Sequence, residues 1–71
     1  MNRLTNIITD ELVGKKYKLE YDLEEAINSK NVPIDDKVKK IIKLLNKINE
    51  VSNAYTTFES YIKNNKTNNN E

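Results

Sequence analysis

One stretch of the chain, residues 34–62, repeats its apolar side chains at alternating steps of three and four, with Lys37 as the one polar member. This spacing is the heptad pattern that lines up side chains along one side of a long α-helix. The residues predicted to form a shared apolar core, with Leu45 on the flank of the series, are Ile41, Leu44, Leu45, Ile48, Val51, Tyr55, Phe58 and Ile62. Because the stripe is broader than a two-helix seam, we expect more than one neighbouring helix to cover it.

The N-terminal half of the chain, residues 3–30, also places apolar residues at helical spacing, from Leu4 to Ile27. Gly14 lies inside this segment and costs about 1 kcal/mol in a helix, so a helix broken near Gly14 is an alternative to an unbroken one. Residues 17–23 alternate apolar and charged side chains, as a half-buried strand does. We favour a helix because Lys, Glu, Leu and Ala dominate residues 15–27 and because a lone strand leaves its backbone unpaired.

Between the two segments, residues 28–33 end in Pro33, which disfavours helix in the preceding residue. The predicted fold is therefore all-α, an antiparallel helical hairpin formed by residues 1–63. Residues 64–71 are rich in Asn and contain no apolar side chain, and we predict that they form a disordered tail.

The size and composition of the chain indicate that it associates. A core built from 71 residues rarely supplies more than ~3–5 kcal/mol of stability. The sequence contains no cysteine and no histidine, which excludes disulfides and the usual zinc ligands. We therefore expect a homodimer in which two hairpins form a helical bundle.

The same composition argues against an enzyme. Without His or Cys, the common pairs of nucleophile and base are missing. The acidic cluster Glu20, Asp22, Glu24 and Glu25 is interpreted as a solvated helix face. No metal and no cofactor is expected. No long apolar run follows the first residues and none is of membrane-spanning length, so we expect no signal peptide and a cytoplasmic protein that does not enter a membrane.

Four lysines, Lys39, Lys40, Lys43 and Lys47, lie opposite the apolar stripe and form a possible anion-binding strip. The alternative function is therefore a small dimeric nucleic-acid-binding protein, either a basic helix or a ribbon-helix-helix protein that uses residues 17–23 as its ribbon. Against this function, the net charge is only +1, and in a hairpin the acidic residues 20–25 lie beside the basic residues 37–43.

Large side chains off the main stripe are the best candidates for contact with another protein, since Tyr combines an apolar ring with a polar tip. This predicted partner-binding set is Tyr17, Tyr21, Ile42 and Tyr61. The predicted function is a non-enzymatic interaction module that acts as a regulator, adaptor or inhibitor of another protein. The excess of Lys over Arg and the abundance of Asn are typical of AT-rich coding sequences, as in phages and mobile elements.

Overall fold

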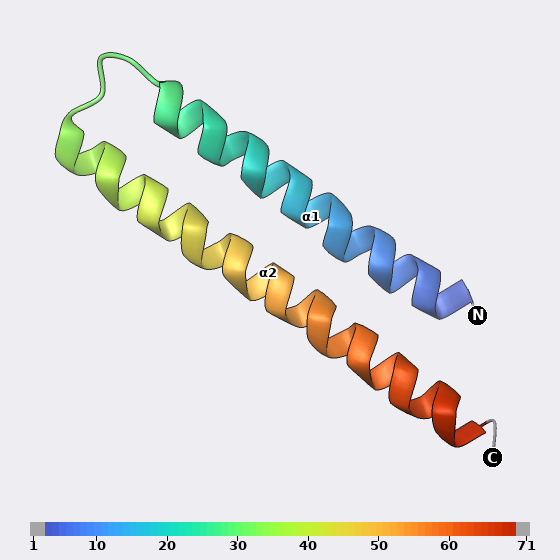
Figure 1. The fold of residues 1–71 in the computed structure, drawn as a ribbon. Helices are drawn as coiled ribbons and strands as arrows, with labels where there is room; N and C mark the ends of the chain where they lie inside the picture. The colour runs from blue at the N-terminus through green and yellow to red at the C-terminus, as the bar shows by residue number, and fades with distance from the viewer. Residues whose placement is uncertain (1–2, 70–71) are drawn as a thin grey trace.

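The computed structural model describes the backbone of residues 3–69 and the side chains of residues 3–64. Two helices account for most of the described backbone, α1 (Arg3–Asn28) and α2 (Ile34–Asn69). They lie antiparallel and side by side, with both ends of the chain at the same end of the molecule (Figure 1). The predicted all-α helical hairpin is confirmed for these residues.

Helix α1 is continuous, which settles both alternatives for the N-terminal half. Residues 17–23 are helical, so the strand interpretation is wrong, and with it the ribbon-helix-helix alternative. Of the two possibilities at Gly14, the unbroken helix is the one observed: α1 passes through Gly14, beside which a Cβ would meet nothing within 4 Å. Good helix formers on both sides of this glycine offset its cost of about 1 kcal/mol.

The linker, residues 29–33, joins the helices through well-defined local contacts. The hydroxyl of Ser29 donates a hydrogen bond of 2.8 Å to the carbonyl oxygen of Ala26 in the last turn of α1. Asn31 has a φ of 64°, the left-handed conformation that Asn tolerates better than most residues. The carbonyl of Pro33 accepts the first hydrogen bond of α2, from the amide of Lys37 at 3.0 Å. Asp35 and Asp36 then place negative charge in the first turn, where the helix dipole favours it.

At its other end, α2 continues to Asn69, past the predicted boundary of the helical domain at residue 63. The side chains of residues 65–69 and the whole of residues 70–71 lie outside the described part of the structure. The disorder of the tail stays a prediction.

The hairpin is elongated and has very little interior. It measures 59 × 17 × 12 Å, and its radius of gyration is 16.7 Å, against about 11 Å for a compact domain of this length. Among the described side chains, only Ala26 and Leu44 are buried, at 5% and 8% exposure. The helices therefore pack along a single line of contact, and neither helix is covered on its remaining sides by any part of the described chain.

Candidate interaction surfaces

Each helix turns a second row of side chains to the same side of the hairpin. Ala26 and Leu44 are buried and so mark the line of contact between the helices. One step along an α-helix rotates the side chain by about 100°. The two right-handed helices run in opposite directions. The residue that follows a buried one therefore lies on the same side of the hairpin in both helices. Ile27 and Leu45 therefore share one side, which we call the open face.

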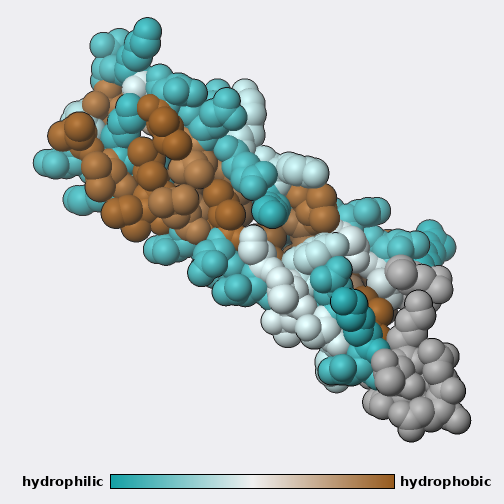
Figure 2. All heavy atoms as spheres, in the orientation of Figure 1, coloured by the Kyte–Doolittle hydropathy of each residue, from teal (hydrophilic) through white to brown (hydrophobic). Residues whose placement is uncertain are grey.

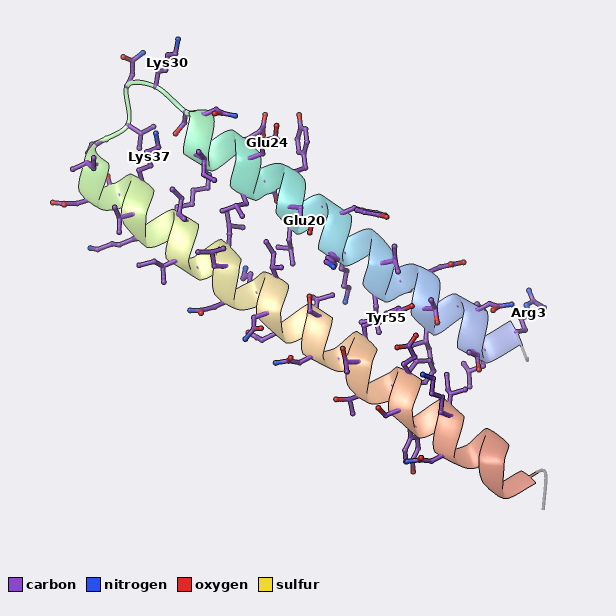
Figure 3. The ribbon with its side chains drawn as sticks, viewed as in Figure 1. Arg3, Glu20, Glu24, Lys30, Lys37 and Tyr55 are labelled. Carbon is purple, nitrogen blue, oxygen red and sulfur yellow. The ribbon has the colours of Figure 1, made fainter. Side chains whose placement is uncertain are left out.

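Two hollows confirm this geometry, because each is lined by side chains from both helices. The middle hollow, of about 220 Å³, includes Val13 and Ser52, which follow the half-buried Leu12 and Val51. The terminal hollow, of about 330 Å³, is lined by Thr5, Asn6, Thr9, Tyr55, Phe58, Glu59, Ile62 and Lys63. The ring of Tyr55 lies between the helices and contributes to both hollows (Figure 3).

The linker-end half of the open face is apolar. Its exposed members, which we call the apolar patch, are Ile27, Ile34, Val38, Ile42 and Leu45, and they are between 48% and 75% exposed. The four α2 residues follow one another at steps of four, four and three, so they form one row along the helix. Figure 2 shows apolar atoms gathered over the linker-end half of the molecule and polar atoms over much of the other half.

The opposite side of the hairpin, which we call the charged face, carries ionisable side chains of both signs. A shallow hollow of about 500 Å³ is lined by Asp22, Glu25, Ala26, Ser29, Val32, Asp36, Lys37 and Lys40. The sequence prediction that acidic residues 20–25 lie beside basic residues 37–43 is confirmed for these members. Of the predicted anion-binding strip, Lys40 therefore lies near carboxylates, while Lys39, Lys43 and Lys47 are exposed elsewhere on α2.

The predicted oligomer core is covered unevenly within one hairpin. Leu44 is buried. The half-buried members are Ile41, Ile48, Val51, Tyr55, Phe58 and Ile62. Leu45 is 49% exposed and belongs to the apolar patch. One partner helix thus leaves much of the α2 stripe uncovered, as its breadth in the sequence suggests.

The four predicted partner-binding residues are all exposed but do not form one site. Tyr17 and Tyr21 lie one turn apart on α1, at 66% and 63% exposure, and the Tyr21 hydroxyl donates a hydrogen bond of 3.4 Å to Glu25. Ile42 belongs to the apolar patch on the other helix. Tyr61 precedes the half-buried Ile62 on α2, close to the chain ends. The four residues therefore lie in three places: Tyr17 and Tyr21 are adjacent on α1, with Tyr17 also lining the middle hollow, and Ile42 and Tyr61 are separate from them.

Sequence reasoning missed two features of these surfaces. The first is that Ile27 on α1 continues the row of exposed α2 residues: Ala26 lies level with Lys37 and Lys40, so its neighbour Ile27 lies near Val38. The sequence did contain a signal for this: Ala26 is small enough to be buried between the helices, so the residue that follows it faces the open side. The second is Lys37, whose ammonium group donates a hydrogen bond to the carbonyl oxygen of Ser29, whereas the heptad pattern shows it only as a polar interruption.

Within the described residues, no group of three or more Asp, Glu, His or Cys side chains is arranged to hold a metal ion. Within their described residues, neither α1 nor α2 is apolar over the length that a bilayer crossing requires. Comparison of the chain with models of protein families, with characterised proteins and with solved structures finds no match. The functional argument therefore depends on the surfaces themselves.

Proposed function

We propose that the chain is a non-enzymatic protein-interaction module of the cytoplasm, which associates with itself through its open face and acts as a regulator, adaptor or inhibitor of another protein. The observation that carries this proposal is that, among residues 3–64, Ala26 and Leu44 are the buried apolar side chains while many large apolar side chains are left in water. A hairpin that needed only its own two helices would gain nothing from exposing them.

The two kinds of exposed apolar surface suit different contacts. The apolar patch is a continuous row of aliphatic side chains, which resembles half of a helical-bundle core. Tyr17 and Tyr21 are exposed one turn apart on α1, with Tyr17 also lining the middle hollow, and a tyrosine pair offers rigid rings with hydroxyl tips for a second protein. We therefore assign the patch to self-association and the tyrosine pair to the regulated protein.

Nucleic-acid binding by the lysine strip is the competing function, and charge argues against it. Lys40 shares its hollow with Asp22, Glu25 and Asp36, and the net charge of the chain is +1. Phosphate backbones would meet negative as well as positive side chains there, which reduces the release of counterions that drives such binding.

The deciding experiment compares three variants of the full chain as bait for partner capture in cells of the source organism. Replacing Tyr17 and Tyr21 with Ala should remove a specific captured protein while the far-ultraviolet circular dichroism stays unchanged. Tyr61→Ala is the matched control, because Tyr61 is equally exposed but distant, and it should retain the partner. Replacing Lys39, Lys40, Lys43 and Lys47 with Gln should change mainly the on-rate and the salt dependence of capture.

The same variants separate the two functions. If the chain binds duplex DNA or single-stranded RNA at physiological salt, and the four-lysine variant abolishes that binding while the tyrosine variant does not, the protein-interaction proposal is wrong.

A further inference from the structure

The geometry points to a homodimer whose seam is the apolar patch, with the linker-end half of one hairpin covering the linker-end half of a second copy. This inference rests on the proposed function, and it adds which part of the open face forms the contact between the two copies. It specifies which residues meet across the two-fold axis: Val38, Ile42 and Leu45 of one copy lie near the same residues of the other. The terminal hollow lies at the other end of the hairpin, outside this seam.

The exposed area of the hairpin matches what a permanent partner would cover. The chain exposes 6056 Å², whereas a compact monomer of 8.3 kDa exposes about 4,600 Å². The excess is about 1,500 Å². Standard interfaces cover about 800 Å² on each partner, and obligate dimers cover more. The excess is spread along the whole elongated chain, so the linker-end half has room for a contact of about the standard size.

A second copy is the occupant that fits the poor interior of the hairpin. With only two of its described side chains buried, a single hairpin lacks the core that would keep it folded, so its partner must be present wherever the chain is made. A second copy of the chain always meets that condition. Charge does not oppose the contact, because two copies of net charge +1 repel weakly and the charged face points away from the seam.

The chemistry of the open face selects which halves meet. The alternative is an end-over-end dimer, in which the linker end of each hairpin lies against the terminal end of the other. In that arrangement the apolar patch would cover the terminal half, where Asn6, Ser52 and Glu59 line the hollows. Covering such groups with aliphatic side chains leaves them without hydrogen-bond partners, which is unfavourable. Patch against patch buries apolar atoms on apolar atoms, and an isologous two-fold contact achieves this with one surface.

Cross-linking tests this arrangement in the folded, full-length protein. The chain has no cysteine, so one introduced residue is unique. Val38→Cys and Leu45→Cys, treated separately with a short bismaleimide, should each give a covalent dimer of twice 8.3 kDa. Tyr61→Cys, which lies off the open face, should not. In an end-over-end dimer, Val38 would lie about 30–40 Å from its mate, so failure of Val38→Cys to link would overturn the proposed register.

Sedimentation equilibrium tests the dimer itself. The wild-type chain should have twice the monomer mass, and its melting temperature should rise with concentration. Val38→Lys with Leu45→Lys should sediment as a monomer of 8.3 kDa and lose helix content. Tyr21→Lys with Tyr61→Lys adds the same charge outside the patch and should remain dimeric. A folded wild-type monomer from micromolar to millimolar concentration overturns the dimer but leaves capture of another protein intact, whereas a dimer with no tyrosine-dependent partner overturns only the proposed function.

Discussion

The ammonium group of Lys37 donates a hydrogen bond of 3.0 Å to the carbonyl oxygen of Ser29, which joins the first turn and a half of α2 to the end of α1. The last turn of α1 carries no basic residue of its own, so Lys37 supplies the positive charge that the carboxyl end of a helix favours. Figure 3 shows Lys37 near the linker, on the α1 side of α2. The one polar residue in the heptad series is therefore explained by its position opposite a helix end.

Lys37→Gln should lower the free energy of unfolding by about 1 kcal/mol, because it removes a charge-assisted hydrogen bond and a favourable charge at the helix end. Lys39→Gln removes the same charge from an exposed position and should change stability by less than about 0.5 kcal/mol. Urea unfolding at one fixed chain concentration measures both. Equal effects of the two variants would show that the Lys37 contact does not stabilise the hairpin.

Asn31 is the second local feature that closes the linker, because its φ of 64° lies where most residues with a Cβ are strained. Asn31→Ala should destabilise the protein by roughly 1 kcal/mol, while Asn31→Gly should be neutral or slightly stabilising. Thermal unfolding of the two variants tests this directly. The expected order of melting temperatures is Gly at or above wild type and Ala below it, and the reverse order would contradict the left-handed conformation.

Much of the fold could be predicted from the sequence, and the failures have physical causes. The α2 stripe repeats regularly over residues 34–62, so the pattern predicted the start and most of the length of the second helix, which continues to Asn69. Residues 17–23 carry an alternation that suits a strand, and the helix forms because neighbouring segments propagate it through Gly14. The surfaces were harder to predict, since Tyr21 and Tyr61 have similar chemistry and both lie off the main stripe. How far apart they lie depends on how the two helices pair, which the sequence pattern does not give.

Gly14→Ala should stabilise the protein by about 1 kcal/mol. Gly14 lies in the interior of a continuous helix, and a methyl group at this position would contact nothing within 4 Å. The gain comes from higher helix propensity and from a less flexible unfolded chain. Differential scanning calorimetry should show a higher melting temperature. A fall in stability would indicate that this position is covered by another molecule, and Gly14→Pro serves as the variant that must break the helix.

Deletion of residues 64–71 should leave the melting temperature unchanged. Helix α2 is 36 residues long and α1 is 26, so α2 extends beyond the helix against which it packs. The deleted segment contains no apolar side chain and therefore has nothing to bury. Calorimetry of the shortened and full-length chains at equal concentration checks this. A drop of several degrees would mean that the segment docks on the hairpin or on a second copy.

The last prediction compares Leu44 with Ile48, which differ in how much of each side chain one hairpin covers. Leu44 is buried, so Leu44→Ala should cost about 2–5 kcal/mol through lost transfer energy and the cavity left behind. Ile48 is only half-buried in the hairpin, and within a single copy its truncation would cost clearly less. In the dimer that we infer, the second copy completes the cover of Ile48, and Ile48→Ala should approach the cost of Leu44→Ala.

Ile7→Ala provides the control for that comparison, because Ile7 is 49% exposed on α1, away from the apolar patch, and should cost under about 1 kcal/mol. Urea unfolding of the three variants should be followed at two chain concentrations, since the stability of a dimer depends on concentration. If Ile48→Ala is no more costly than Ile7→Ala at either concentration, then no second copy covers Ile48, and the breadth of the α2 stripe serves another partner.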